Sequence, residues 1–454
     1  MTSVPPPESL DAIFKAYDIR GIYPDQINET IARLVGNAFV GFTSADRVLV
    51  GRDARPSSEP LVEAFVDGAR LAGADVVDLG LASTDLVYFA SGNLDAPAAM
   101  FTASHNPAQY NGIKLCRAGA APVGEDTGLR QLKAVVAEGL LERAEEPGRV
   151  ERQDLLGAFV AHVRSFVDVD ALRPMRVVAD TANGVGGLIV PAVFSGLPFE
   201  LTVLFGELDG TFPNHPADPI QPENLKDLQR AITSETADVG LAFDGDADRV
   251  FLVDNEAVPV SGSTTTAILA KAILDRNPGG KVVHNLICSR TVPEVVREAG
   301  GTPIRSRVGH SFIKAVMAET DAVFGGEHSA HYYFRDNYRA DSGIIAALMV
   351  LEQLSITGVP LSELRRPFER YAASGEVNRR VADPAAVIGQ VEEAFADGRR
   401  DHLDGLTVEY DDWWFNLRPS NTEPLLRLNV EAGDAAACEE RTNEVLAIVG
   451  GEAD

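Results

Sequence analysis

The sequence predicts an α/β protein of four domains, in which three related mixed α/β domains and a smaller α+β carboxyl-terminal domain surround a central cleft. Its 454 residues suffice for about three domains of roughly 150 residues each, and four are compatible with that length. A basic residue followed by a short β-branched run occurs three times, which is typical of buried parallel strands. From about residue 368 the pattern changes to closely spaced strands between helices. We therefore divide the chain into residues 1–148, 149–253, 254–367 and 368–454.

The composition excludes several classes of protein. With 45% hydrophobic and 24% charged residues, the chain can bury several cores and does not have the composition of a disordered protein. Lysine and arginine number 40 against 67 aspartates and glutamates, so the formal net charge is −27. This charge repels nucleic acids and anionic membrane surfaces, and we expect neither as a partner. An anionic small ligand would need a locally basic pocket.

The cysteines and the amino terminus indicate the compartment. Cys116, Cys288 and Cys438 lie far apart and have no metal-binding spacing, which suits a reducing compartment without disulfides. The first ten residues lack the pattern of a secretory leader, and no apolar run approaches the roughly 18 residues of a membrane span. We therefore expect a soluble cytoplasmic protein.

Each of the three repeated units begins with a β-branched strand, continues through a connecting segment and returns to a second strand. The predicted strand pairs are 47–50 with 75–79, 176–180 with 201–204, and 281–285 with 303–308. Apolar residues at helical spacing predict helices over 61–72 and 291–299, between the strands of the first and third pairs. Strand, helix and parallel strand in this order form a βαβ unit.

A third strand in each unit ends in an unusually polar loop. The strands and their loops are 98–101 with TASHNP (102–107), 239–243 with DGDADR (244–249), and 322–324 with GGEHSAH (325–331). Ligands of open parallel sheets bind beyond the carboxyl ends of the strands. Three such loops therefore predict three walls of one cleft, although connecting loops are often polar for no functional reason.

The carboxyl-terminal segment predicts a meander of strands between two helices. Asp383 and Pro384 begin a helix that reaches about residue 396, because proline suits the first helical position. The strands that follow are 406–410, 413–418 and 425–431, and a final helix covers 435–449. This arrangement is an α+β module.

The loop DGDADR offers three carboxylates at alternate positions, Asp244, Asp246 and Asp248. Oxygen ligands alone suit a hard cation, Mg²⁺ before Mn²⁺ or Ca²⁺. A calcium EF-hand would need glycine and glutamate where the chain has Arg249 and Asn255, so that interpretation fails. The alternative is a turn whose acids cap backbone amides. Beside a bound cation, Arg249 would be free to hold a phosphate.

Ser104 in TASHNP is a candidate nucleophile, exposed at the end of a strand with His105 beside it and Lys114 nearby in the NGIK segment. A hydroxyl attacks poorly at neutral pH unless a base or a metal activates it. The alternative is that Ser104 caps a helix or turn that Pro107 punctuates.

The loop RPSNTEP (418–424) offers a guanidinium, two hydroxyls and successive backbone amides. Arg418 could fork onto phosphate oxygens while the amides complete the site. A hairpin turn in which Ser420 and Thr422 bond locally is the alternative. Together with Glu327, Ser329 and His331 in the GGEHSAH loop, these features favour phosphoryl transfer on a small polyhydroxylated anion.

Five motifs resemble those of the α-D-phosphohexomutases. They are KAYDIRG (15–21), TASHNP, DGDADR, GEHSAH and RPSNTEP, in this order and over nearly the whole chain. Within that family the sequence is most similar to the bacterial phosphomannomutase/phosphoglucomutase branch. The resemblance implies interconversion of hexose 6-phosphate and hexose 1-phosphate, with mannose, glucose or both as the sugar. It also implies a phosphoserine enzyme and a hexose 1,6-bisphosphate that is both intermediate and activator.

The resemblance also implies roles for individual residues. Ser104 would carry the phosphoryl group, and one of its oxygens would join Asp244, Asp246 and Asp248 in holding one Mg²⁺. Glu327 and Ser329 would bond the sugar hydroxyls O3 and O4, while Arg418, Ser420, Asn421 and Thr422 would hold the phosphate that is not reacting. Further catalytic and cleft-lining positions are Arg20, His105, Lys114, Arg249, His310 and His331. Lys114 and His310 are the candidates for proton transfer, and Lys114 would need a lowered pKa to act as a base.

Two positions depart from the family pattern and bear on the sugar. Ala330 stands where glycine is commoner, and His328 occupies the variable position of the loop. Phosphoglucosamine mutase therefore remains an alternative function. A metal-dependent phosphatase and a sugar-phosphate-binding relative without turnover are two further alternatives. As partners we expect a small phosphosugar and, at most, a weak dimer of the chain.

Overall fold

The loop that contains Ser104 connects two neighbouring strands of the first sheet. A computed structural model describes residues 7–139, 141–419 and 425–453. The strand order is β1-β5-β4-β2-β3-β7, with β6 paired to β5. The strands are β1 (Ile19–Ile22), β2 (Arg47–Arg52), β3 (Asp75–Leu81), β4 (Ala98–Phe101), β5 (Tyr110–Arg117), β6 (Ala121–Pro122) and β7 (Val150–Arg152). The helices are α1 (Pro7–Ile13), α2 (Glu29–Thr43), α3 (Ser58–Leu71), α4 (Thr84–Leu94) and α5 (Leu129–Glu138).

The second and third sheets follow along the chain. Their strand orders are β12-β11-β10-β8-β9 and β14-β13-β15-β16. The second comprises β8 (Met175–Asp180), β9 (Phe199–Leu204), β10 (Val239–Phe243), β11 (Val250–Asp254) and β12 (Pro259–Val260), with α6 (Leu156–Arg164), α7 (Gly186–Phe194) and α8 (Lys226–Glu235). The third comprises β13 (Lys281–Asn285), β14 (Thr302–Ser306), β15 (Phe324–Gly326) and β16 (Tyr332–Phe334), with α9 (Gly262–Arg276), α10 (Thr291–Glu298), α11 (His310–Thr320), α12 (Gly343–Thr357) and α13 (Leu361–Leu364).

The first three sheets share one topology. Each contains three parallel strands, and the strand that comes first in the chain lies in the middle of the three. The orders are β4-β2-β3, β10-β8-β9 and β15-β13-β14. An antiparallel strand, β5, β11 or β16, then returns beside the third strand. The prediction of three related mixed α/β domains is therefore confirmed. The antiparallel strands were missing from the prediction because their pairing depends on a distant strand rather than on a local pattern.

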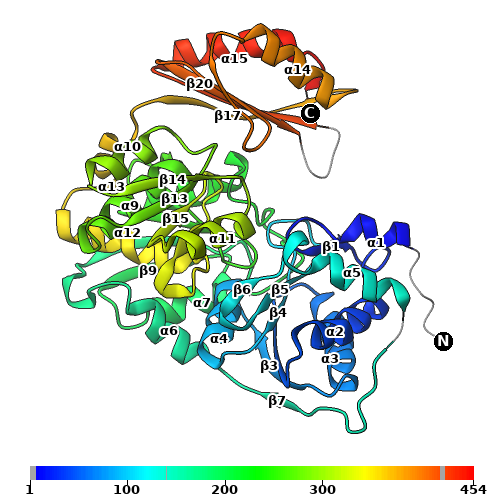
Figure 1. Cartoon of the computed structure of the whole chain (residues 1–454). Coiled ribbons are helices and arrows are strands. Elements are labelled where there is room, and N and C mark those ends of the chain that lie inside the picture. Colours follow the sequence, from blue (N-terminus) through cyan, green and yellow to red (C-terminus); the bar gives the residue numbers. More distant parts are fainter. Residues whose placement is uncertain (1–6, 140, 420–424, 454) are drawn as a thin grey trace.

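The fourth sheet is antiparallel and carries two helices on one face (Figure 1). Its order is β18-β19-β20-β21-β17-β22. The elements are β17 (Ala372–Arg380), β18 (Arg399–Asp401), β19 (Leu406–Glu409), β20 (Trp413–Pro419), β21 (Leu425–Ala432), β22 (Glu452–Ala453), α14 (Pro384–Ala394) and α15 (Ala435–Val449). The smaller α+β domain is confirmed. Strand β17 was not predicted, because its polar sequence AASGEVNRR extends only by pairing with β21.

Short polar side chains begin many of the helices. Asn28, Ser261, Ser342, Asp383 and Asp434 each accept a hydrogen bond from a backbone amide in the first turn of the helix that follows. The prediction that a helix begins at Asp383 and Pro384 is confirmed by this geometry. Such caps stabilise the first turns of these helices.

The sheets bear on the predicted domain boundaries without deciding them. Strand β7 pairs with β3 of the first sheet, although it follows the predicted boundary at residue 148. Strand β12 pairs with β11 of the second sheet, although it follows the boundary at residue 253. The exact division of the chain stays a prediction.

Buried side chains form one large cluster that runs through the first three domains and a separate cluster in the fourth. A further cluster fills the other face of the first sheet. No single helix in the described residues is long and apolar enough to cross a membrane. Only the pair Gly343–Thr357 and Leu361–Phe368, bent by 91°, passes that test when its two helices are taken together. Helix α12 of this pair lies almost entirely in the large buried cluster.

Candidate active site

The loop after β4 turns sharply at Ser104, whose φ of 50° is left-handed. Its backbone amide donates to Thr102 Oγ1 at 2.8 Å, which stabilises the turn. The Ser104 Oγ donates a hydrogen bond to Asp244 Oδ2 at 2.7 Å. The same Oγ accepts from Arg249 Nη2 at 3.3 Å. The expectation of an exposed serine was wrong, since Ser104 is only 4% exposed. The loop after β10 covers it, and tertiary packing rather than local sequence decides that burial.

Arg55 holds the backbone of the serine loop in place. This fully buried arginine donates to the carbonyl oxygens of Ser104 at 2.8 Å, Asn106 at 2.7 Å and Pro107 at 2.8 Å. Its Nε pairs with Asp53 Oδ2 at 3.0 Å, which offsets the buried charge. Sequence reasoning missed Arg55. Its place just after the first parallel strand was the available signal.

Three buried carboxylates follow β10. Asp244, Asp246 and Asp248 each offer a ligand oxygen, and these oxygens lie within 4.8 Å of one another. The Oδ1 atoms of Asp246 and Asp248 are buried and have no hydrogen-bond partner among the described residues. Converging carboxylate oxygens with spare lone pairs suit a hard divalent cation. The predicted metal-binding loop therefore has the donor set that such an ion requires.

Cationic side chains pair with the same carboxylates. Lys114 on β5 places its Nζ 3.0 Å from Asp246 Oδ2 and 2.7 Å from Asp248 Oδ2. Arg249 Nε donates to Asp244 Oδ2 at 2.8 Å, and the Thr84 hydroxyl donates to Asp246 Oδ2 at 2.6 Å. Thr84 was missed by the sequence analysis because it precedes this loop by more than 150 residues and matches no motif.

The pKa of Lys114 does not meet the condition for a base in this structure. Burial alone would lower that pKa, but the attraction of Asp246 and Asp248 outweighs burial and raises it well above its usual value. Burial raises the pKa of Asp244 despite the neighbouring Arg249. Burial also favours the protonated form of Asp246, yet Lys114 and Thr84 hold the pKa of that carboxyl below its usual range. The carboxylates and Lys114 thus form one closely coupled charged cluster.

His310 is the first residue of α11. Burial lowers its pKa well below the usual value, and the positive charge of Lys314 lowers it further. Its Nδ1 is buried and has no hydrogen-bond partner among the described residues. The ring packs against Tyr17 with 5.2 Å between ring centroids. A neutral imidazole with a free nitrogen can accept a proton.

The loop after β15 brings three polar side chains to the same region. Glu327 accepts hydrogen bonds from Gly309 N at 3.0 Å and from the Tyr333 hydroxyl at 2.6 Å. The Ser329 hydroxyl and His331 Nδ1 are 3.1 Å apart. Ala330 has φ of 64°, so it adopts the left-handed conformation that glycine adopts more easily. This conformation explains physically why a glycine would suit position 330.

The three predicted loops meet in direct contact. Ser104 bonds to Asp244, and His331 Nε2 lies 3.8 Å from Asp248 Oδ1. His105 Nδ1 is 3.4 Å from the Ser104 hydroxyl, and burial followed by the charge of Arg249 lowers the pKa of His105. Arg20 on β1 joins them by donating to Asn106 Oδ1 at 2.6 Å. The loops at the ends of three different sheets therefore form one site.

A buried ion pair between Lys314 and Asp341 lies next to His331 of this site. Lys314 Nζ and Asp341 Oδ1 are 2.9 Å apart, and both side chains are almost completely buried. The ammonium group also lies 3.8 Å from the ring centroid of Tyr88 in the first domain. His331 Nε2 lies 4.0 Å from the second oxygen of Asp341. Sequence analysis missed this pair, because nothing local links residues on α11 to those before α12.

Arg418 on β20 lies in the fourth domain and is buried. It donates from Nη1 to Asn429 Oδ1 at 3.0 Å and from Nη2 to Glu376 Oε2 at 2.6 Å. The other predicted phosphate-binding residues, Ser420, Asn421 and Thr422, lie outside the described residues.

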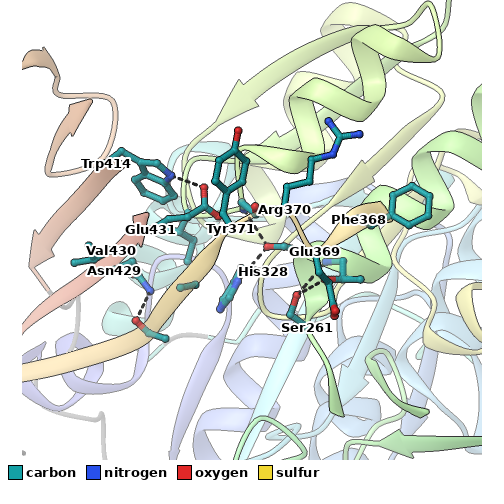
Figure 2. A pocket seen from close by; sticks show the side chains of 16 residues that line it. Ser261, His328, Phe368, Glu369, Arg370, Tyr371, Trp414, Asn429, Val430 and Glu431 are labelled. Carbon is teal, nitrogen blue, oxygen red and sulfur yellow. Dashed lines mark hydrogen bonds between the residues drawn. The ribbon is translucent and has the colours of Figure 1, made fainter. Parts of the chain in front are cut away.

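A cavity of about 290 Å³ separates parts of the third and fourth domains. Figure 2 shows its walls, with His328 and Ser261 on the side of the third domain and Trp414 and Glu431 on the other. The chain that links the two domains runs along this cavity through residues 368–371. The fourth domain therefore contacts the third around a cavity rather than through a continuous core.

Family models match all four parts of the chain. Residues 11–141, 157–257 and 261–371 match phosphoglucomutase/phosphomannomutase alpha/beta/alpha domains I, II and III, and residues 376–448 match the C-terminal domain of the same family.

Curated relatives and solved structures agree with these matches. A phosphomannomutase of Salmonella montevideo is 41% identical over 448 residues, covering 96% of this chain and 98% of the relative. Phosphohexose mutases of Xanthomonas campestris are 42% identical over 437 residues, covering 95% and 98%. The crystal structure of a phosphoglucomutase/phosphomannomutase family protein from Burkholderia thailandensis superposes with a TM-score of 0.88 at 33% identity, covering 97% of this chain and 99% of that one.

The fold and the site first define a class, that of four-domain α/β enzymes in which a serine loop faces an acidic loop whose carboxylates could hold a metal ion. The matches then define the family. The chain belongs to the phosphoglucomutase/phosphomannomutase family.

Proposed function

We propose that this enzyme is a phosphohexomutase that interconverts the 6-phosphate and 1-phosphate of a hexose, with mannose, glucose or both as the sugar. The observation that carries the proposal is the Ser104 hydroxyl, 2.7 Å from Asp244 in a loop of three buried carboxylates. The names of the relatives support the substrate class. Phosphoserine at position 104 and a hexose 1,6-bisphosphate are the proposed intermediates.

The negative charge of the phosphorylated site would require a divalent cation. A phosphoserine would carry about −1.5 to −2 charge at pH 7. Three carboxylates add to this, while Lys114 and Arg249 offset only part of it. Asp244, Asp246 and Asp248, with a phosphoserine oxygen, would hold one Mg²⁺, which supplies Lewis-acid charge to the transferring group.

The proposed reaction consists of two phosphoryl transfers. A sugar hydroxyl attacks the phosphorus on Ser104, so that a sugar O–P bond forms and the Ser104 Oγ–P bond breaks. Arg249, with Nη2 at 3.3 Å from Oγ, stabilises the charge on the oxygens of the transferring group. The bisphosphate then turns end for end, and its other phosphate returns to Ser104. The substrate thereby leaves with its phosphate on a different carbon.

We assign the proton transfer from the attacking hydroxyl to His310. Its buried Nδ1 has no hydrogen-bond partner among the described residues, and its pKa is lowered, so it is neutral at pH 7. Lys114 remains the other candidate. In this structure its Nζ is already engaged by two carboxylates, which argues for His310 as the first residue to test.

The proposed substrate contacts lie in two domains. Glu327 and Ser329 would bond O3 and O4, His331 would line the cleft, and Arg418 with its loop would hold the phosphate that is not reacting. Mannose and glucose differ only at C2, so contacts to O3 and O4 would not distinguish them. We therefore expect both sugars to be substrates. A ratio of kcat/KM above about a thousandfold, or about 4 kcal/mol, in coupled assays would contradict this expectation.

The decisive experiment maps phosphate on the purified protein and compares two serine variants. We expect one phosphoryl group on Ser104, and we expect Ser104→Ala to lose at least about a thousandfold of the mutase activity while still folding. Ser234→Ala, at an exposed position on α8, is the matched control and should retain activity. Full activity of Ser104→Ala would refute the proposal.

Three further expectations accompany this function. Added hexose 1,6-bisphosphate should activate an enzyme purified without phosphate on Ser104. The three cysteines are free and buried, which supports a cytoplasmic location. Size-exclusion chromatography with light scattering should show a monomer or a weak dimer.

A further inference from the structure

The buried guanidinium of Arg418 already has an anionic partner. Burial lowers the pKa of Arg418, and the carboxylate of Glu376 acts in the opposite direction. Glu376 lies on β17, and its Oε2 is 2.6 Å from Arg418 Nη2. A buried cation without such a partner would be strongly unfavourable. Glu376 has no role in the proposed function so far.

A second guanidinium shares this carboxylate. Arg427 on β21 is the direct cross-strand partner of Arg418 on β20. Its Nη1 lies 3.4 Å from the other oxygen of Glu376, and its buried Nε has no hydrogen-bond partner in the described part of the chain. Two like charges opposite each other on a sheet repel. Glu376 therefore holds together two cations that would otherwise move apart.

The neighbours of this triad fix its geometry. Asn429 accepts from Arg418 Nη1 at 3.0 Å and donates to the Gly375 carbonyl oxygen at 3.3 Å. Glu376 and Asn429 are also backbone partners across β17 and β21. The carboxylate is thus placed by the sheet itself, with its side chain 30% exposed and open to solvent.

We propose that Arg427 is a second phosphate-holding cation and that Glu376 is a positioning residue, a counter-charge that aligns both arginines and limits how tightly they bind phosphate. This inference rests on the proposed function, which places a phosphate at Arg418. Two guanidinium groups alone would bind a phosphate dianion strongly. The carboxylate repels the same dianion, so the net charge of the triad is only +1. The reaction needs this compromise, because the bisphosphate must release its bound phosphate before it can turn.

The direction in which phosphate affinity changes in Glu376→Gln distinguishes this role from a merely structural one. Glu376→Gln keeps the shape and a hydrogen-bond acceptor but removes the charge. We expect inorganic phosphate and glucose 1-phosphate to bind about three- to tenfold more tightly by isothermal titration calorimetry. KM and kcat should both fall, because release of the intermediate becomes slower. If Glu376 only supports the arginines, both ligands will bind more weakly, and that result would overturn the proposal.

Two controls accompany this variant. Glu439→Gln makes the same change in net charge at an exposed position on α15 and should leave phosphate binding unchanged. Glu376→Asp keeps the charge and should bind inorganic phosphate within about twofold of the unmodified enzyme. Equal tightening by Glu439→Gln would show that the effect is one of net charge, and the specific role of Glu376 would be rejected.

Arg427→Gln tests the second cation without altering Glu376, and therefore remains informative if Glu376→Gln does not fold. We expect it to weaken binding of inorganic phosphate about three- to tenfold, and an unchanged affinity would overturn the role of Arg427. Arg418→Gln tests the proposed phosphate site separately from the inference about Glu376. If it leaves phosphate binding unchanged, the phosphate site of the proposed function is wrong. If it weakens binding while Glu376→Gln also weakens it, only the counter-charge inference fails.

Discussion

The first three domains and the fourth domain are built differently. One buried cluster includes Val77 of the first sheet, Val177 of the second and Val282 of the third, so these domains pack as a continuous body. The fourth domain has its own cluster, which includes Phe415 and Val430. In Figure 1 the fourth domain lies beyond the other three and is joined to them by the chain leading into β17.

Polar contacts rather than a shared core connect the fourth domain to the third. Arg290, which directly precedes α10, donates to the carbonyl oxygens of Asp411 at 3.1 Å and Trp413 at 3.0 Å. Arg305 on β14 pairs with Asp401 and with Glu409. Such contacts can break and form again with little cost. Ser104 and the three carboxylates after β10 therefore lie on one packed body, whereas Arg418 lies on a separately packed module.

The largest expected difference between the packed body and the fourth domain lies in how their variants affect catalysis. We expect Asp246→Asn, in the packed body, to lower kcat at least about a hundredfold, because it removes a proposed ligand of the cation. Arg418→Ala, in the fourth domain, should mainly raise KM. Steady-state kinetics at several Mg²⁺ concentrations measures both effects, and the exposed Asp412→Asn is the control. Removal of metal by EDTA should mimic Asp246→Asn reversibly; equal effects of both variants on KM alone would contradict the division.

The separate cores can be tested with a matched pair of phenylalanines. Phe159 on α6 packs against Phe89 of the first domain, with ring centroids 5.7 Å apart, and Phe415 packs against Phe395, with ring centroids 5.0 Å apart, within the fourth domain. Replacing either fully buried ring by alanine should cost about 3 to 5 kcal/mol of unfolding free energy.

The two variants should lose stability in different domains. By hydrogen exchange and calorimetry, Phe415→Ala should destabilise the fourth domain alone, and Phe159→Ala should destabilise the first and second domains together. If both variants lower a single common transition by the same amount, the fourth domain does not fold as a separate unit.

The packed body also contains a pH-sensitive contact. Asp85 on α4 accepts a hydrogen bond from the Ser342 hydroxyl at 2.6 Å, across the junction of the first and third domains. Burial raises the pKa of Asp85 to about 7. The folded protein therefore holds this proton to a higher pH than the unfolded chain does. The contribution of Asp85 to stability is complete below about pH 4 and is lost as the pH rises through about 7.

We therefore expect the free energy of unfolding, measured in EDTA, to fall by about 2 to 4 kcal/mol from this group between pH 4 and pH 8. Asp85→Asn should abolish that part of the slope, because asparagine does not titrate. The exposed Asp126→Asn in the same domain should keep the slope. An identical slope in Asp85→Asn and the unmodified protein would show that Asp85 does not titrate in this range.

The smallest expected effect concerns the contact between the third and fourth domains. Arg290→Ala should raise KM about two- to fivefold with little change in unfolding free energy, because Arg290 orients the module that carries Arg418. Arg297→Ala is the matched control, since Arg297 on α10 is exposed and its side chain makes no hydrogen bond or ion pair with the described residues. A loss of several kcal/mol in Arg290→Ala would show that this contact supports the fold and not only the orientation.

Much of the fold could be predicted because its signals are local. The run 239–243 is a fully buried strand that ends at Phe243, directly before Asp244, as its apolar sequence indicates. The antiparallel strand β5 was not predicted, although it carries Lys114. It pairs with β1 and β4, and only that pairing makes its mixed sequence a strand. Pairing between distant segments leaves no pattern in a single window of sequence.

The same limit applies to the side chains of the site, because contacts between distant residues leave no local pattern in the sequence. The alternation of Asp244, Asp246 and Asp248, together with their carboxylate chemistry, predicts a cation site from the sequence alone. Thr84 had no local signal, and the place of Arg55 just after a parallel strand did not indicate what it contacts, so the tertiary contacts alone define both roles.

By itself, the sequence located the parallel strands and the polar loops that follow them, and it indicated the kind of chemistry that their side chains can perform, because propensity, periodicity and functional groups are properties of neighbouring residues. Only the tertiary structure decided that Ser104 is buried against Asp244, that Lys114 is engaged by two carboxylates and that Glu376 joins Arg418 to Arg427. These charges interact through a buried, low-dielectric environment, and burial depends on every domain that covers them.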